Sequence, residues 1–428
     1  MLDIRFVREN HSLVLKDLEK RGDKEKQAWL KDLLALDEKY RVLLQNGDAL
    51  KKQRNDITES INQLKSQGKD FSAKIKEAKE LPNKIKEIDA SLAPLKEKID
   101  FYLLRLPNVL HDSVPVGKDD SENVVVCEVG KKIARPNLPP HGDILEKNGW
   151  ADFDRATKVA GSGFYFLQGD FALLDFALQR FAIDLLMKKG FRLIQPPLMM
   201  NRKAYEGVTD LGDFESVMYK IDSEDMYLIA TSEHPMAAMY RDEIFQESQL
   251  PIKLAGISPC FRREIGKHGI DTRGIFRVHQ FNKIEQFVFC KPADSWAFHE
   301  ELLANAELLF NELGLAYRVV NICTGDIGIV AAKKYDMEVW MPREEKYREV
   351  VSCSNCTSYQ AVRSNVKFRL KGGDKDYVHT LNSTAIATSR ALRALVETHY
   401  DEKRNSITIP KVLQPYMNGM KEILPVSE

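Results

Sequence analysis

The sequence predicts an α+β protein in which a long antiparallel coiled-coil hairpin precedes a domain built on an antiparallel sheet. Two observations carry this prediction. A heptad repeat of apolar residues runs through the N-terminal part of the chain, and beyond a linker at 106–126 it gives way to short segments of alternating polarity. Heptads are typical of paired helices, whereas alternation with frequent turns is typical of strands.

The heptad repeat begins at Trp29, and its positions then step by four and three residues in strict alternation to Leu64. Its members are Trp29, Leu33, Leu36, Tyr40, Leu43, Gly47, Leu50, Arg54, Ile57, Ile61 and Leu64. A break at 66–70 precedes a second apolar run from Phe71 to Leu106, where Pro82 predicts a kink or local unwinding. Two such helices joined by a glycine-containing turn predict an antiparallel hairpin of roughly 54 Å, at ~1.5 Å per residue.

The distal half of this arm is basic. Its basic residues are Lys51, Lys52, Arg54, Lys65, Lys69, Lys74, Lys76, Lys79, Lys84 and Lys86, and its acids are Asp56, Glu59, Asp70, Glu77 and Glu80. By charge alone this pattern is more typical of a solvated coiled-coil surface. The alternative is a surface that contacts the phosphates of an RNA backbone.

Composition limits the remaining possibilities. Basic and acidic residues balance at 63 each in 428 residues, so nucleic-acid binding would have to come from a local patch. No apolar run approaches the ~20 residues that span a bilayer, and the start MLDIRFVREN does not resemble a secretory signal. Six irregularly spaced cysteines predict reduced thiols. We therefore expect a cytoplasmic protein without membrane contact, divided by the linker into residues 1–106, with the arm at about 27–104, and residues 107–428.

The most informative segment runs from Cys260 to Phe289. Arg262, Arg263 and Glu264 precede a loop with Gly266, Gly269 and Gly274. The return segment alternates, with Ile275, Arg277, His279 and Phe281 on one face and Phe276, Val278 and Gln280 on the other. This alternation predicts two long strands joined by the loop. Arginines, an acid and an aromatic on one face can hold a polyphosphate and a flat base.

The same segment resembles motif 2 of the class II aminoacyl-tRNA synthetases, written FRxE, a loop, and RxxxF. The longer string DTRGIFRVHQFNKIEQF, residues 271–287, resembles the seryl-tRNA synthetase family in particular. The resemblance implies a class II catalytic domain at 107–428 and a tRNA-binding domain at 1–106, whose arm grips the long variable arm of tRNA(Ser). A helix at 173–188 and the extended segment to Pro197 resemble motif 1, which implies a homodimer.

The resemblance also implies the site residues. Arg262 and Arg390 are expected to be catalytic. Serine is expected to contact Thr231, Ser232, Glu233, Arg262, Glu285, Asn382 and Thr384. ATP is expected to contact Arg262, Arg263, Glu264, Arg277, Phe281, Glu349, Val350, Val351, Ser352 and Arg390, with Glu349 and Ser352 holding the Mg²⁺ that accompanies it. Oxygen ligands suit that ion, and a guanidinium binds phosphate and carboxylate bidentately.

Several of these segments have simpler interpretations. Without the other motifs, Thr231-Ser232-Glu233 would be read as the start of a helix. A carboxylate at Glu285 can accept from either the hydroxyl or the ammonium of serine. The family commonly has Asn-Gly-Ser where this chain has Asn382-Ser383-Thr384, so the last hydroxyl is kept and a methyl is added.

The spacing of Cys353 and Cys356 suggests a zinc site, but the sequence offers no second pair of ligands. Cys323 and His379 are scattered candidates, so no structural zinc is expected.

The implied reaction is the activation of L-serine by ATP to seryl-adenylate, followed by transfer to the 3′ end of tRNA(Ser); the resemblance leaves open whether a selenocysteine tRNA, tRNA(Sec), is also charged. One alternative is a paralogue that loads a carrier protein, which the basic arm argues against. Another is a catalytically inactive RNA-binding or scaffolding protein. The set Arg262, Glu264, Arg277, Phe281 and Arg390 argues against this second alternative.

Overall fold

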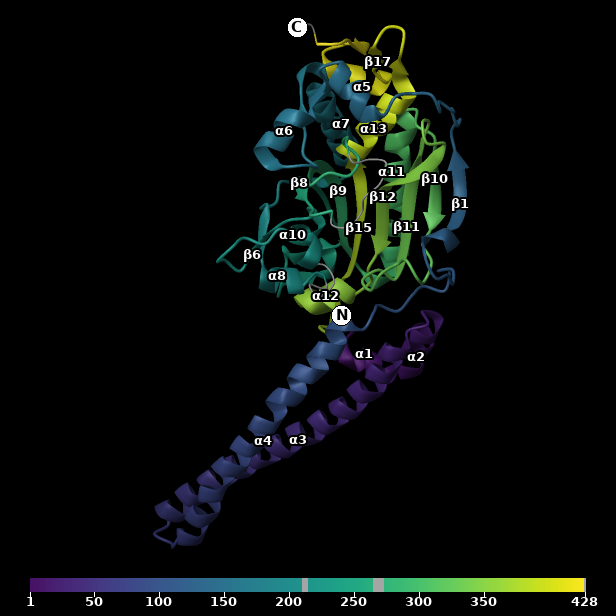
Figure 1. Ribbon diagram of the computed structural model, residues 1–428. Helices are drawn as coiled ribbons and strands as arrows, with labels where there is room; N and C mark the ends of the chain where they lie inside the picture. The colour runs from purple at the N-terminus through teal and green to yellow at the C-terminus, as the bar shows by residue number, and fades with distance from the viewer. Residues whose placement is uncertain (210–214, 265–272, 427–428) are drawn as a thin grey trace. The chain divides into compact units, whose positions relative to one another are not determined.

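The structure is a computed structural model that describes residues 1–209, 215–264 and 273–426 (Figure 1). The chain divides into two compact units, Met1–Pro107 and Asn108–Glu428. Within the described ranges, no helix is both long and apolar enough to cross a membrane.

The first unit is entirely helical. Its helices are α1 (Ile4–Glu9), α2 (His11–Lys20), α3 (Lys24–Ser66) and α4 (Ser72–Arg105). The Asp23 side chain starts α3 by accepting a hydrogen bond from the backbone N–H of Lys26, and Gly68 adopts a φ of 66° in the turn between the long helices. Glycine reaches this left-handed conformation without steric cost. The predicted antiparallel hairpin is therefore confirmed.

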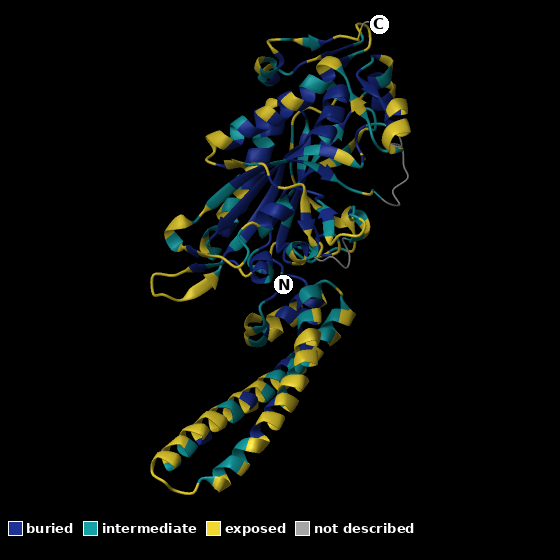
Figure 2. Cartoon of the chain, turned by 90° about the vertical axis from the view of Figure 1, so that its left-hand side faces the viewer, coloured by how far each residue is buried: buried dark blue, intermediate teal, exposed yellow. Residues whose placement is uncertain are grey.

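The heptad positions form the contact between α3 and α4. Every predicted position from Trp29 to Leu64 is buried or half-buried except Arg54. Gly47 fits this seam because a Cβ there would lie 3.3 Å from Cγ2 of Ile88 on the opposite helix. The outer faces of both helices are exposed (Figure 2).

The unwinding predicted at Pro82 is not found, since α4 continues through this residue. Its neighbours Leu81 and Ile85 are 3% and 8% exposed in the seam. Their burial against α3 compensates for the backbone hydrogen bond that proline cannot donate.

The second unit is built on an eight-stranded sheet. Its strands, in spatial order, are β1 (Val124–Val129), β10 (Tyr317–Asn321), β11 (Lys333–Met341), β12 (Lys346–Asn355), β15 (His379–Ala387), β9 (Gln280–Cys290), β8 (Ile252–Phe261) and β4 (Arg192–Ile194). All neighbours are antiparallel except β4 and β8. This architecture confirms the predicted α+β class.

Smaller sheets and helices complete this unit. The small sheets are β14 (Lys375–Tyr377), β13 (Lys367–Arg369) and β7 (Ile244–Gln246); β16 (Tyr400–Asp401), β17 (Ser406–Thr408) and β18 (Glu422–Ile423); β2 (Ala151–Asp152) and β3 (Phe166–Leu167); and β5 (Met199–Asn201) and β6 (Met226–Leu228). The α-helices are α5 (His141–Lys147), α6 (Phe153–Ala160), α7 (Gly169–Lys188), α8 (Arg202–Glu206), α10 (Glu233–Ala238), α11 (Ser295–Glu312), α12 (Tyr359–Ser364) and α13 (Thr388–His399). The 3₁₀ turns are η1 (Asp120–Glu122), η2 (Glu215–Val217), η3 (Glu247–Gln249), η4 (Pro292–Asp294) and η5 (Lys411–Met417).

Helix α11 covers one face of the central strands. Gln286 of β9 donates to the carbonyl of Leu302 at 3.0 Å, and the Cys353 thiol of β12 contacts the carbonyl of His299 at 3.7 Å. Because successive side chains of a strand point to opposite faces, the neighbours of Gln286 and Cys353 point away from α11. That other face carries the candidate site.

The strands of the motif 2 hairpin are shorter than predicted. Strand β8 ends at Phe261 and β9 begins at Gln280, with one further backbone bond from Arg262 N–H to the His279 carbonyl at 2.9 Å. The strand predicted from Ile275 is wrong, because residues 275–279 are irregular and both Ile275 and Phe276 are buried. Apolar side chains here follow packing in a loop rather than the two faces of a strand. Gly266 and Gly269 lie outside the described residues.

Candidate active site

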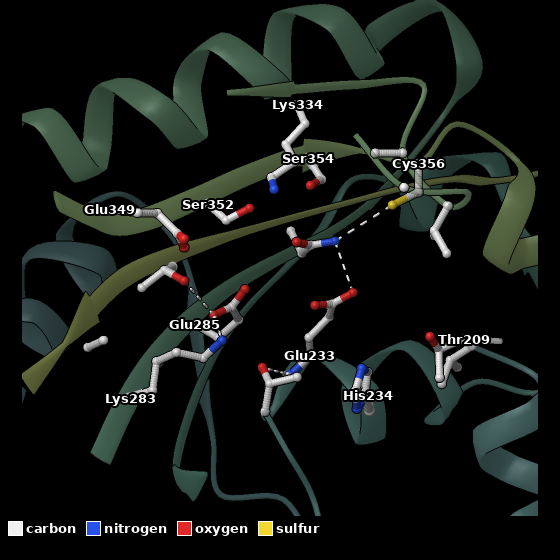
Figure 3. A pocket seen from close by; sticks show the side chains of 18 of the residues that line it. Thr209, Glu233, His234, Lys283, Glu285, Lys334, Glu349, Ser352, Ser354 and Cys356 are labelled. Atoms are coloured by element: carbon white, nitrogen blue, oxygen red, sulfur yellow. Dashed lines mark hydrogen bonds and ion pairs between the residues drawn. The ribbon is translucent and has the colours of Figure 1, made fainter. Parts of the chain in front are cut away.

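A cavity of about 400 Å³ opens on the sheet face away from α11 (Figure 3). Strands β9, β12 and β15, the start of α10, and the segments after β8 and before β11 contribute its wall. The predicted site residues that line it are Thr231, Glu233, Arg262, Phe281, Glu285, Glu349, Val350, Ser352, Asn382, Thr384 and Arg390. Predicted site residues as much as 159 positions apart in the sequence, Thr231 and Arg390, thus line one cavity.

Arg262 lies just beyond the end of β8. Its Nε donates to the carbonyl of Ala230 at 3.4 Å, and its guanidinium carbon lies 5.3 Å from the centre of the Phe281 ring. Its positive charge partly opposes the rise in the pKa of Glu233 that desolvation causes, and, after Arg390 and Lys334, contributes to the lowered pKa of Glu349. Arg262 therefore shares one cavity with residues predicted to bind serine and residues predicted to hold the metal.

Glu233 is held by neutral donors. Its Oε1 accepts from the amides of Gln360 at 3.2 Å and Asn382 at 3.1 Å, while its backbone N–H donates to the Thr231 hydroxyl at 3.1 Å. Desolvation, and then the nearby charge of Glu285, raise the pKa of Glu233 to about 7, although Lys283, Gln360 and Arg262 act in the opposite direction. The carboxyl is thus poised to gain its charge when a cation arrives.

Glu285 is held by a charged donor. Lys283 Nζ lies 2.6 Å from Glu285 Oε2, and the two side chains are 7% and 2% exposed. Thr384 stands opposite Glu285 in the β9–β15 register and donates to the same oxygen at 3.3 Å. The hydroxyl of Thr384 therefore faces Glu285, although Thr384 carries a methyl group that the serine common in the family lacks.

A β-bulge brings Glu349 and Ser352 to the same cavity. In a regular strand, residues three apart point to opposite faces. Here Met337 pairs with Val351 and Glu338 with Glu349, so Val350 is the extra residue, and Glu349, Val350 and Ser352 all line the cavity. The bulge therefore lets Glu349 and Ser352 line the same cavity although they are three residues apart.

Arg390, in the first turn of α13, contacts Glu349. Its Nη1 donates to the carboxylate at 3.1 Å and to the Glu349 carbonyl at 3.0 Å. Desolvation alone would raise the pKa of Glu349, but Arg390, Lys334 and Arg262 together hold it below its ordinary value. The Glu349 carboxylate is therefore charged at neutral pH.

Five predicted site residues do not line this cavity. Ser232 is fully buried and its hydroxyl donates to the Gly256 carbonyl at 3.3 Å. Val351 is buried in the core. Arg263 donates its backbone N–H to the Val217 carbonyl at 2.9 Å. Glu264 and Arg277 form an ion pair of 3.7 Å, and Arg277 lines a separate cavity of about 220 Å³.

The structure adds cavity residues that the sequence did not single out. Lys283 lies two residues before Glu285 on β9, and this spacing, which is visible in the sequence, places both side chains on the same face of a strand. Gln360 of α12 and Lys334 of β11 also line the cavity, and Lys334 pairs with Asp336 at 3.3 Å. No local pattern marks Gln360, because only the packing of α12 against β15 brings it to Glu233.

The two cysteines with CxxC spacing have different surroundings. Cys353 faces α11, whereas the Cys356 sulfur accepts from the Asn382 amide at 3.7 Å beside Glu233. Both thiols are buried, and burial raises their pKa values.

Comparison with known proteins agrees with this architecture. A family model described as the seryl-tRNA synthetase N-terminal domain matches residues 1–110, and the tRNA synthetase class II core domain (G, H, P, S and T) matches residues 218–399. A serine–tRNA ligase of Methanocella arvoryzae is 62% identical over 424 residues, which covers 98% of this chain and 100% of the relative.

Solved structures give the same result. Seryl-tRNA synthetase from Pyrococcus horikoshii complexed with ATP is 48% identical, with a TM-score of 0.92 and coverage of 100% of both chains. The cytoplasmic serine–tRNA ligase from Naegleria fowleri in complex with AMP is 38% identical, with a TM-score of 0.87 over 100% of this chain and 99% of the other. Identity at this level over the whole length shows more than a shared fold: the chain belongs to the seryl-tRNA synthetase family of class II aminoacyl-tRNA synthetases.

Proposed function

We propose that this chain condenses L-serine with ATP to seryl-adenylate and pyrophosphate, and then transfers the seryl group to the 3′ end of tRNA(Ser). The observation that carries the proposal is that Arg262, Glu233 and Glu349 line one cavity. A guanidinium there can bind the serine carboxylate and the α-phosphate together, which aligns the attacking oxygen with phosphorus.

Serine fits this cavity in one orientation. The donors to the Glu233 carboxylate are uncharged amides, so the ammonium of serine can act as its positively charged partner. Glu285 already has Lys283 as its counter-charge and therefore suits the neutral hydroxyl, together with Thr384. This orientation points the carboxylate at Arg262.

ATP occupies the other half of the proposed site. Phe281 stacks under the adenine, while Arg390 covers the other face of the base and reaches the γ-phosphate. Glu349 and Ser352 would hold the Mg²⁺ that accompanies ATP, which adds positive charge to the phosphates. The proposed contacts of Glu264 with the adenine amino group and of Arg277 with the terminal phosphates require their ion pair to separate when ATP binds.

Attack by a serine carboxylate oxygen on the α-phosphorus forms the acyl phosphate bond and breaks the bond to the bridging oxygen, so pyrophosphate leaves with its electron pair. The carboxylate is already deprotonated, and the step therefore needs no protein base. Charge neutralisation and alignment by Arg262 and Arg390 are what the residues contribute.

The N-terminal region, residues 1–106, is proposed to bind tRNA through the arm at about 27–104, and residues 107–428 to carry catalysis. Motif 1 supports a homodimer, and Phe176 and Met187 of α7 leave 65% and 52% of their surface exposed for such a contact. All six cysteines are unpaired thiols, which supports the cytoplasm as the compartment.

Serine-dependent ATP–pyrophosphate exchange, followed by charging of tRNA(Ser), tests this function. We expect both activities in the wild-type chain. Absence of exchange would support the inactive scaffold, and exchange without tRNA charging would favour the carrier-loading paralogue. The same charging assay with tRNA(Sec) decides whether the second tRNA is an acceptor.

The raised pKa of Glu233 predicts the pH dependence of serine activation. Below pH 7 the Glu233 carboxyl is largely protonated and cannot pair with the ammonium, whereas above about 7 it is charged. Hence kcat/KM for serine in the exchange reaction should rise with pH through about 7 and then level off. Glu285, Lys283, Arg262 and Gln360 surround this carboxyl and stay in place in the Glu233→Gln variant. That variant should be slower and lack the rise; an unchanged pH profile would show that another group titrates.

A further inference from the structure

Lys283 and Glu285 form a buried pair that faces the cavity. They are two residues apart on β9 and therefore share a strand face, where Nζ and Oε2 lie 2.6 Å apart (Figure 3). Both contacts that the structure describes for this carboxylate, from Lys283 and from Thr384, go to Oε2. The other oxygen, Oε1, is left for a ligand.

The second carboxylate of the cavity has a different environment. Glu233 Oε1 accepts from the two uncharged amides of Gln360 and Asn382. A buried carboxylate costs free energy unless a counter-charge lies close to it. At Glu233 the substrate can bring that charge, whereas at Glu285 the protein supplies it in advance.

We propose that Lys283 is a positioning residue for hydroxyl selection, which holds Glu285 as a fixed, charged acceptor for the side-chain hydroxyl of serine. This inference rests on the proposed function. A charged acceptor forms a stronger hydrogen bond with the hydroxyl than a neutral one does. When alanine binds, the same acceptor stays buried without a donor at Oε1, so the pair penalises the amino acid that lacks the hydroxyl.

The test compares serine with alanine in ATP–pyrophosphate exchange. Lys283→Met removes the charge and keeps a long side chain, and Lys283→Arg keeps the charge. Glu285→Gln removes the acceptor charge. The double variant Lys283→Met with Glu285→Gln buries no unpaired charge, so it is expected to fold even where the single methionine variant does not.

We expect Lys283→Met to lower the ratio of kcat/KM for serine to that for alanine by roughly tenfold or more, mostly through the serine KM. Lys283→Arg should restore much of this ratio. Because Lys283 acts through Glu285, the double variant should be no less selective than Glu285→Gln alone.

Two results would overturn the proposal. One is an equal loss of serine and alanine activation with a higher KM for ATP, which would assign Lys283 to the nucleotide. The other is a double variant whose loss of selectivity is the sum of the two single losses. Lys253→Met is a matched control: Lys253 lies on the neighbouring strand β8 and pairs with Glu301 of α11 at 2.7 Å, and it does not line the cavity. Failure of the proposed function would appear as a wild-type chain without serine-dependent exchange, whereas failure of the Lys283 proposal leaves that exchange in place.

Discussion

Replacement of Arg262 by alanine is expected to reduce serine-dependent ATP–pyrophosphate exchange by roughly 10³-fold or more. Removal of a single preorganised donor at a developing charge costs about 10²–10³ in kcat, and Arg262 is proposed to serve both the carboxylate and the α-phosphate. Its charge also partly opposes the raised pKa of Glu233 and contributes to the lowered pKa of Glu349, so its loss disfavours the charged form of both carboxylates. Exchange with radioactive pyrophosphate measures the effect.

The Arg262 variant should keep its fold, because the side chain makes only one hydrogen bond of 3.4 Å to the Ala230 carbonyl and one contact with the Phe281 ring in the described structure. Thermal unfolding by circular dichroism checks this expectation. Arg318→Ala is a suitable control, since Arg318 pairs with Glu338 at 2.5 Å and does not line the cavity. Exchange close to the wild-type rate in Arg262→Ala would refute the assignment.

Removal of the distal arm is expected to separate the two half-reactions. A variant that lacks residues 48–86 should exchange pyrophosphate normally but lose tRNA(Ser) charging at tRNA concentrations that saturate the wild type. The ends can be joined by a short turn, because Gly47 packs directly against Ile88 across the hairpin. Aminoacylation with serine at saturating concentration measures the loss.

Salt dependence gives an independent check of the arm. If basic residues such as Lys52 and Lys86 contact phosphates, the KM for tRNA should rise steeply with salt in the wild type, and the dependence should be weaker in the deletion variant. Charging that persists in the deletion variant at wild-type efficiency would mean that the arm is not the tRNA contact. An equal loss of exchange would instead indicate damage to the catalytic unit.

The periodic parts of this fold could be predicted from the sequence. The heptad positions from Trp29 to Leu64 lie along one side of a helix, so their apolar side chains are buried when this side packs against a second helix. Leucines and isoleucines at that spacing therefore predicted α3, α4 and their pairing. The motif residues around Arg262 and Glu285 likewise identified the two strands that carry the centre of the site.

Alternation predicted less well where no partner strand exists. Residues 275–279 alternate in polarity, yet they form a loop, because the ladder between β8 and β9 ends at Phe261 and Gln280. The spacing between Lys283 and Glu285 indicated that the two side chains lie on the same strand face, but it did not indicate the 2.6 Å contact between them. Gln360 reaches Glu233 only through tertiary packing, and a single sequence contains no local signal for that approach.

The bulge at Val350 means that chain length around the site matters separately from residue identity. A conservative substitution at this position changes one side chain in the cavity wall. Deletion of Val350 would remove the bulge and make the pairs Glu338–Glu349 and Met337–Val351 consecutive in a regular ladder, so Glu349 and Ser352 would stay on the same face with one residue between them instead of two. The extra residue therefore works as a spacer that keeps a three-residue interval compatible with a two-residue strand period, and its loss would change the spacing of Glu349 and Ser352 along the strand rather than the face on which they lie.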